Sequence, residues 1–249
     1  MIDTEFNASQ IVREWDLNAE ARHAQIVSKI DVSYHKILIP TLLQLMGNIK
    51  HLNVLDVGCG SGIFASEMSK SGARVIGIDP SSEMIRIANT EYGKIENVKF
   101  YCNSIHEFAK FTDKNFDVVI SNMSLITIQN LDDTIKSIST LLKQKGKFVF
   151  NITHPCFWNQ YRKYEPNELF EYKKEHPQKG KFVISNDQNA LPSPTTHFHR
   201  PLERYFQSLK NAGFTIEDII EPYPNEEDMK RYSKPWEVPR FLSIKSLKL

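Results

Sequence analysis

Short apolar runs alternate with amphipathic stretches through the middle of the chain. Strands are predicted at residues 53–57, 73–79, 97–102, 116–121 and 147–153, with helices between them at 63–70, 82–91 and 132–143. Strands that alternate with helices usually pair in parallel through right-handed crossovers, and the helices then cover both faces of the sheet. The pattern therefore predicts an α/β fold with a doubly wound sheet at its centre.

The regions outside this alternation have other patterns. Helices are predicted at 7–30, 32–46 and 203–212, and strands at 214–220 and 240–247. The stretch between Pro155 and Pro201 is aromatic-rich and broken by further prolines, so the alternation fails there. We interpret the chain as a single domain, 1–249, in four parts: a helical lid at 1–50, a core at 51–153, an inserted cap at 154–201 and a completing segment at 202–249.

Composition argues against several classes of protein. The 249 residues include 31 Lys and Arg against 30 Asp and Glu, a net charge of +1, whereas a nucleic-acid-binding domain usually has a basic excess. The chain has no long uncharged apolar run and its N-terminus is polar, so we expect no membrane partner and no targeting peptide. Three cysteines without metal-ligand spacing predict reduced thiols, no metal site and a cytoplasmic location. Both a monomer and a homodimer fit these observations.

The stretch NVLDVGCGSG at 53–62 joins the first predicted strand to a glycine turn. Ligands of open parallel sheets bind beyond the carboxyl ends of the strands, and glycines there let a ligand approach the backbone closely. The second strand ends in Asp79, 21 residues after Gly58, a spacing that suits an acid accepting the hydroxyls of a ribose. Two cofactors fit this much, a dinucleotide and S-adenosylmethionine.

Two residues discriminate between these cofactors. The dinucleotide pattern G-x-G-x-x-G asks for glycine at the position of Ile63. Asp56 lies inside the strand just behind the turn, where its charge repels a pyrophosphate but suits an ammonium and a sulfonium. The pattern favours S-adenosylmethionine.

Four segments, LDVGCGSG, IGIDPSSEMI, FDVVISNMSL and LLKQKGKFVF, resemble the successive motifs of class I S-adenosylmethionine-dependent methyltransferases over roughly residues 50–153. WDLNAEARH, THPCFW, FHRPLERYFQSLKNAGF and VPRFLSIKSLK are similar to one bacterial subgroup of small-molecule methyltransferases, with HPCF after the fifth strand and unassigned substrates. The resemblance implies a Rossmann-like sheet of seven strands, mostly parallel, with an antiparallel last strand inserted beside the sixth.

The resemblance also implies a set of cofactor contacts. They are Asp56, Gly58, Cys59 and Gly60 at the amino-acid end, Asp79 at the ribose, Pro80 and Met84 beside the adenine, Asn103, Ser104 and Ile105 near the adenine amine, Asn122 and Met123 along the methionine portion, and Trp15 and Tyr34 as a lid. Asn103 stands where the family usually has an acid, so we expect a weaker contact there. Met84 fits a purely structural place in the core equally well.

Two histidines are candidates for a general base. His154 follows the fifth strand at the carboxyl edge of the sheet, and a histidine can transfer protons near neutral pH. The alternative is that His154 holds the entry turn of the cap through its hydrogen bonds. His199 lies where the cap returns to the core and is predicted to face the pocket, with Arg200 orienting an acidic group of the substrate. The alternative for Arg200 is an ion pair with an acid of the protein.

The cap indicates the kind of substrate. Its aromatic residues are Phe157, Trp158, Tyr161, Tyr164, Phe170, Tyr172, Phe182 and Phe198, which could roof an apolar or aromatic substrate or form a small core for the cap itself. We predict methyl transfer to an O or N atom of a small molecule. A methyltransferase of RNA, DNA or protein remains an alternative, although SNMS after the fourth strand lacks the prolines and aromatic ring typical of base methylation. A non-catalytic scaffold that binds the cofactor is a second alternative.

Overall fold

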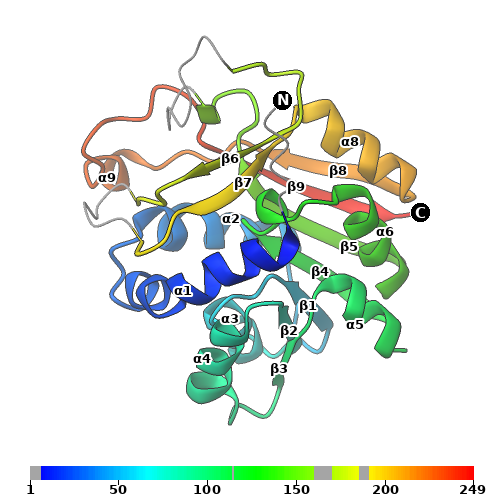
Figure 1. Ribbon diagram of the computed structural model, residues 1–249. Coiled ribbons are helices and arrows are strands. Elements are labelled where there is room, and N and C mark those ends of the chain that lie inside the picture. Colours follow the sequence, from blue (N-terminus) through cyan, green and yellow to red (C-terminus); the bar gives the residue numbers. More distant parts are fainter. Residues whose placement is uncertain (1–6, 114, 160–169, 185–190) are drawn as a thin grey trace.

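A computed structural model of the chain describes residues 7–113, 115–159, 170–184 and 191–249. Its centre is a seven-stranded sheet in the order β3-β2-β1-β4-β5-β9-β8 (Figure 1). The strands are β1 (Asn53–Val57), β2 (Arg74–Asp79), β3 (Val98–Cys102), β4 (Phe116–Asn122), β5 (Leu142–Thr153), β8 (Phe214–Ile220) and β9 (Phe241–Lys248). β1 to β5 pair in parallel, and β9 runs antiparallel to both of its neighbours, β5 and β8. This confirms the predicted α/β fold.

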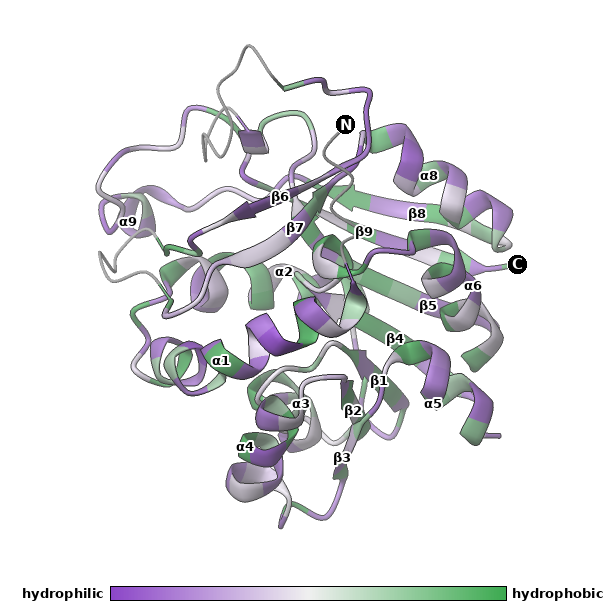
Figure 2. Ribbon diagram, in the orientation of Figure 1, coloured by the Kyte–Doolittle hydropathy of each residue, from purple (hydrophilic) through white to green (hydrophobic). Residues whose placement is uncertain are grey.

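Helices cover both faces of the sheet because alternate side chains of each strand point to opposite faces. On β1, Leu55 and Val57 join the core beneath α5 (Ile105–Phe111), α6 (Leu131–Leu141) and α8 (Leu202–Asn211). Val54 instead joins the core beneath α2 (Ile39–Met46), α3 (Ile63–Lys70) and α4 (Ser82–Tyr92). Figure 2 shows the central strands β4 and β5 coloured mainly as hydrophobic. The site therefore stands on a sheet that is rigidly packed from both sides.

One element starts earlier than the pattern predicts. The helix expected at 132–143 ends at Leu141, and β5 begins at Leu142, five residues before the predicted start at 147. Phe116 pairs with Leu142, and the register then shifts before Val118 pairs with Lys147. The early part of β5 is polar and follows this irregular pairing, so apolar periodicity could not reveal it.

The N-terminal segment forms one helix, α1 (Ala8–Val27), then the π-helical turn η1 (Tyr34–Leu38) that leads into α2. Asn7 caps α1 by accepting a hydrogen bond from the Ser9 amide. In Figure 1, α1 crosses between the pair α3 and α4 and a small hairpin. The Asp16 carboxylate binds α1 to the start of α4, since it accepts a hydrogen bond from the Ser81 hydroxyl at 2.6 Å.

The cap contains a two-stranded sheet that the sequence pattern does not predict. β6 (His176–Gly180) and β7 (Thr195–His199) pair antiparallel, with Gln178 opposite His197. Pro177 is compatible with β6 because β6 is an edge strand of a sheet of only two. Two aromatic residues of the cap, Tyr161 and Tyr164, lie outside the described residues. The remaining short elements are η2 (Leu125–Thr127) and α9 (Glu226–Met229).

Candidate functional site

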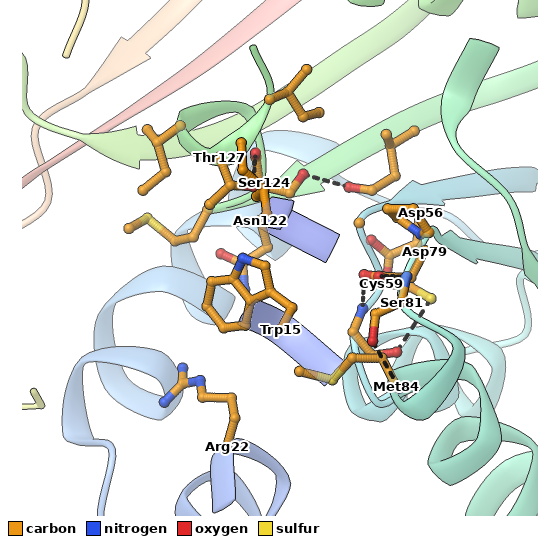
Figure 3. A pocket seen from close by; sticks show the side chains of 18 of the residues that line it. Trp15, Arg22, Asp56, Cys59, Asp79, Ser81, Met84, Asn122, Ser124 and Thr127 are labelled. Carbon is orange, nitrogen blue, oxygen red and sulfur yellow. Dashed lines mark hydrogen bonds between the residues drawn. The ribbon is translucent and has the colours of Figure 1, made fainter. Parts of the chain in front are cut away.

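A cavity of about 460 Å³ opens at the carboxyl ends of β1, β2 and β4, with α1 and the cap contributing further walls. Every residue predicted to contact a cofactor lines it: Trp15, Tyr34, Asp56, Gly58, Cys59, Gly60, Asp79, Pro80, Met84, Asn103, Ser104, Ile105, Asn122 and Met123. Figure 3 shows Asp56, Cys59, Asp79 and Ser81 gathered on one side of the cavity, with Trp15 facing them across it. The candidate bases His154 and His199 are not among the lining residues.

The backbone amides of the glycine turn donate hydrogen bonds within the protein. The backbone amides of Gly58 and Cys59 both donate to the Ile78 carbonyl, at 2.8 and 3.0 Å. The Gly60 amide donates to the Asp79 carboxylate at 3.0 Å. Each of these three amides already has a partner within the protein, which favours the carbonyls of this turn over its amides as ligand contacts. Within the described part of the chain, the Gly58 carbonyl accepts no hydrogen bond, so it remains an acceptor for a ligand cation.

The turn also leaves room for a ligand. Gly60 has φ +53°, and an added Cβ would meet only the Met84 sulfur at 3.8 Å. Gly58 has φ +73°, and its Cβ would overlap the Ser124 side chain. Both glycines are needed for the left-handed backbone, and Gly60 additionally keeps the cavity open.

Two carboxylates, the buried Asp56 and the half-buried Asp79, lie at the ends of adjacent parallel strands. Burial raises the pKa of Asp56 to about 8, and the neighbouring Asp79 charge adds to this rise. Burial raises the pKa of Asp79 to about 6, opposed by hydrogen bonds from the Ser81 and Gly60 amides. Neither acid has an ion-pair partner among the described residues. A cationic ligand in this cavity would stabilise both in their ionised form.

The side of the cavity beyond Asp79 is apolar and preorganised. Met84 is buried and packs with Ala19 and Ile87 while it also lines the cavity, so it belongs to the core and its contact with an adenine stays a prediction. Asn103 is held beside Asp79 because its amide donates to the Asp79 carbonyl at 3.1 Å. Ser104 caps α5 in a capping box with Glu107. The hydroxyl of Ser104 is therefore engaged, which favours packing over hydrogen bonding to a ligand there.

The end of β4 carries a strained residue at the cavity wall. Met123 adopts φ +60°, a left-handed conformation that an unbranched L-residue rarely takes. Its amide donates to the Asn151 carbonyl at 3.0 Å, and the Asn151 side chain donates to the Asn122 side chain at 3.2 Å. These bonds hold Asn122 and Met123 at the carboxyl end of β4, where both residues line the cavity.

Arg22 on α1 is a lining residue that the sequence analysis missed. Its guanidinium pairs with Asp31 at 2.7 Å and stacks over the Phe182 ring at 5.1 Å. The next residue, His23, forms a hydrogen bond from Nδ1 to the Ser61 hydroxyl at 3.0 Å, which keeps this turn of α1 close to the glycine turn. Arg22 lies seven residues after Trp15, two helical turns along the same face, and this spacing was the available signal.

His154 occupies the structural place that was its alternative. Its Nε2 lies 2.7 Å from a Glu221 carboxylate oxygen, and its Nδ1 accepts a hydrogen bond from the Cys156 amide at 3.2 Å. Because Nδ1 is an acceptor here, Nε2 carries the proton and donates a hydrogen bond to Glu221. Both nitrogens hold the entry turn of the cap, so the geometry does not support a role for His154 as the base.

His199 and Arg200 are also turned toward the protein. The Nε2–H group of His199 donates to the Tyr172 carbonyl at 2.8 Å. The Arg200 side chain is fully buried and pairs with Glu175 at 2.7 Å. It also donates to the carbonyls of Leu125, Ile128 and Gln129 around η2, at 3.1, 2.5 and 2.8 Å. The ion pair with an acid of the protein is therefore the correct interpretation of Arg200, and its contact with substrate is wrong.

The fold and the site place this chain among the Rossmann-like methyltransferases. A methyltransferase domain family matches residues 48–191, so the chain belongs to that family. A solved structure of a candidate S-adenosylmethionine-dependent methyltransferase from Listeria monocytogenes is 27% identical, with a TM-score of 0.66 over 84% of this chain and 97% of that one. One from Mesorhizobium loti is 22% identical, with a TM-score of 0.65 over 84% of this chain and 96% of that one. The cofactor of these neighbours is S-adenosylmethionine.

Relatives in sequence include an uncharacterized protein of Haemophilus influenzae, 27% identical over 74% of this chain and 75% of the relative. A ubiquinone biosynthesis O-methyltransferase of Serratia proteamaculans is 29% identical over 56% of this chain. The match spans 55% of that enzyme, so the chain covers only about half the length of these curated O-methyltransferases.

Two further features are absent from the described residues. No helix there combines the length and apolar character needed to cross a membrane. No group of three or more His, Cys, Asp or Glu in the same ranges could hold a metal ion.

Proposed function

We propose that this protein binds S-adenosylmethionine in the cavity and transfers its methyl group to an O or N atom of a small apolar or aromatic molecule. The observation that carries the proposal is the pair of carboxylates, the buried Asp56 and the half-buried Asp79, in one cavity with Gly58, whose carbonyl accepts no hydrogen bond among the described residues. Such a wall of acceptors suits a ligand with cationic groups and a ribose, and it disfavours a pyrophosphate.

The polar and apolar groups that line the cavity suit the different parts of this cofactor. Asp56 and the Gly58 carbonyl would receive the ammonium group, and the Arg22 guanidinium would receive the carboxylate of the same amino-acid end. Asp79 would hold the ribose, since each of its carboxylate oxygens accepts one backbone amide and keeps acceptor capacity. Pro80, Met84 and Ile105 are the apolar surfaces available to the adenine. When bound, the cofactor supplies a methyl group already activated by its sulfonium.

The protein contributes mainly alignment. Displacement at a methyl carbon needs the attacking atom in line with the carbon–sulfur bond, and holding the reactants in position can account for about 7–11 kcal/mol of barrier reduction. The walls that could position a substrate come from η1, the end of β4, the cap and the start of β9, where Leu38, Met123, Trp158 and Phe241 line the cavity. Aromatic and aliphatic walls of this kind support an apolar or aromatic substrate. The similarity to O-methyltransferases of ubiquinone biosynthesis supports an oxygen as the acceptor atom.

Calorimetry with S-adenosylhomocysteine tests the proposal without a known substrate. We expect saturable binding to the wild type, and a loss of roughly 10–100-fold in affinity in Asp79→Ala, since hydrogen bonds to a charged group contribute about 1.5–3 kcal/mol each. Asp218→Ala is the matched control, because Asp218 is an exposed acid on the edge strand β8. Absence of binding of either form of the cofactor to folded protein would overturn the proposal.

A further inference from the structure

The cavity continues past Met123 into a region that we call the substrate lobe, defined by Met123, Trp158, Phe182, His197 and Phe241. Trp158 and Phe241 belong to one buried cluster, and Met123 packs against it. Phe182 of the cap also lines the cavity and meets the Trp15 ring of α1 edge-on, at 6.3 Å between centroids. Flat aromatic walls suit a flat aromatic ligand better than a flexible aliphatic one.

His197 is the titratable group that this lobe contains. It lies on β7, is buried, and its imidazole meets the Phe182 ring at 6.3 Å between centroids in an edge-to-face arrangement. Among the described residues, His106 is the other histidine that lines the cavity. His106 follows the segment proposed for the adenine, and its ring nitrogens lie near the Ser137 and Thr134 hydroxyls at 3.1 and 3.5 Å. His197 is therefore the imidazole placed on the substrate side.

The charges around His197 are matched within the protein. From α1, Arg22 lies over the other wall of the lobe and is paired with Asp31 at 2.7 Å, while Glu14 is paired with Lys179 of β6 at 2.6 Å. The nearby histidines on the hairpin are His176 and His199, whose rings contact each other at an angle of 45°, with 5.2 Å between centroids. The two acids named here, Asp31 and Glu14, are each already paired with a cation, which favours an uncharged substrate over a cationic amine.

We propose that the substrate lobe binds a phenol-type hydroxyl compound and that His197 is the base that takes its proton. This inference rests on the proposed methyltransferase function and names the substrate class of the same site. An imidazole can deprotonate a phenol, whose acidity resembles that of a tyrosine, far more readily than an aliphatic alcohol.

The step is balanced without any further reactant. The hydroxyl proton moves to an imidazole nitrogen of His197, and the phenolate oxygen forms a bond to the methyl carbon. The bond between that carbon and sulfur breaks, and its electron pair stays on sulfur. The imidazolium then releases its proton to water, so the products are the methyl ether, S-adenosylhomocysteine and one proton.

Two catechols of different acidity test the role of the base. At pH 7.5 the hydroxyl of catechol is un-ionised, whereas the more acidic hydroxyl of 4-nitrocatechol is already ionised and needs no base. We expect His197→Gln to lower kcat with catechol by about 10²–10⁴-fold, with KM changed only slightly and kcat with 4-nitrocatechol lowered less than tenfold. The affinity of the same variant for S-adenosylhomocysteine, measured by calorimetry, should stay within threefold of the wild type.

Each other outcome has a defined meaning. An equal loss with both catechols, or a selective loss that follows His154→Gln or His199→Gln instead, would overturn the role of His197. If the wild type binds S-adenosylhomocysteine but methylates neither catechol, the substrate class is wrong while the methyltransferase proposal stands. If His197→Gln does not fold, imidazole NMR of the wild type decides: the His197 ring signals must shift when catechol is added to protein saturated with S-adenosylhomocysteine, and unchanged signals overturn the proposal.

Discussion

Glu14 on α1 accepts a hydrogen bond from the Thr196 backbone amide of β7 at 2.8 Å, although 182 residues separate them. The other carboxylate oxygen accepts the Thr196 hydroxyl at 3.1 Å and pairs with Lys179 at 2.6 Å. Asn18, one turn further along α1, binds both the amide and the carbonyl of Ser193. These bonds therefore fasten the cap to α1, the helix that carries Trp15.

The first prediction concerns this fastening. Glu14→Ala removes the acceptor of a buried backbone amide, so we expect the free energy of unfolding to fall by about 1–3 kcal/mol and the Thr196 amide to exchange hydrogen faster. Glu20→Ala is the control on the same helix, because Glu20 is exposed and its ion pair with Arg86 is a surface pair contributing about 0–1 kcal/mol. Urea unfolding and hydrogen exchange followed by NMR measure both effects. Equal behaviour of the two variants would contradict the assignment.

The second prediction compares Arg200 with Arg204, two arginines near the point where the cap returns to the core. Arg200→Met removes a buried guanidinium that bonds three carbonyls around η2, so we expect a loss of about 2–4 kcal/mol in the free energy of unfolding. The carbonyls of Ile128 and Gln129 belong to residues that line the cavity, so the affinity for S-adenosylhomocysteine should also fall several-fold.

Arg204→Met is the matched control for Arg200→Met. Arg204 also pairs with Glu175 but is partly exposed, and its main partner Asp132 lies at the surface. We expect a loss of about 1 kcal/mol or less and unchanged cofactor affinity. Calorimetry and urea unfolding of the two variants decide, and equal losses of affinity would show that η2 does not depend on Arg200.

The third prediction concerns the glycine turn. Gly58→Ala places a Cβ 2.3 Å from the Ser124 Cβ at φ +73°, so steric overlap adds to backbone strain, and stability should fall by about 2–4 kcal/mol. Gly213→Ala at φ +81° meets nothing within 4 Å and should lose only the strain, about 1–2 kcal/mol. Thermal unfolding compares them. A Gly58→Ala variant as stable as Gly213→Ala would mean that the turn can move away from Ser124.

Local patterns in the sequence were sufficient for the central sheet and its cofactor edge. β1 to β4 are short apolar strands next to amphipathic helices, so their existence follows from periodicity alone. Asp56 and Asp79 could be placed because the end of a parallel strand fixes the position of its last residues relative to the neighbouring strand. These inferences need no knowledge of how distant segments pack.

The cap could not be predicted in this way, because its structure depends on long-range contacts. β6, with the sequence HPQKG, has no apolar alternation and is held by pairing with β7, which in turn is held by Glu14. His197 and His199 lie two residues apart on β7, so sequence spacing could not distinguish the one that lines the main cavity. The contact of Phe182 with His197 does distinguish them, and that contact exists only in the folded chain.

The last prediction follows from the two carboxylates of the cavity, Asp56 and Asp79. In the unliganded protein their pKa values, about 8 for Asp56 and about 6 for Asp79, lie above the usual value of 3.8, so the folded state holds protons that the unfolded state releases. The stabilising contribution of each acid is complete below its unfolded pKa and is lost as the pH rises through its folded pKa. Between pH 6 and 8 the Asp56 proton dominates, and we expect the free energy of unfolding to fall by on the order of 2 kcal/mol.

Two measurements check this pH dependence. In urea unfolding, Asp56→Asn should remove most of the decline between pH 6 and 8, because the amide does not titrate, whereas Asp218→Ala should keep it. In calorimetry at pH 7, binding of S-adenosylmethionine to the wild type should release protons into the buffer, since a cationic ligand favours the ionised carboxylates. A wild-type stability that stays constant from pH 6 to pH 8, or ligand binding without proton release, would mean that Asp56 is already ionised in the unliganded protein. In that case some other group would have to stabilise the Asp56 charge, because the hydrogen bonds and ion pairs of the described residues do not do so.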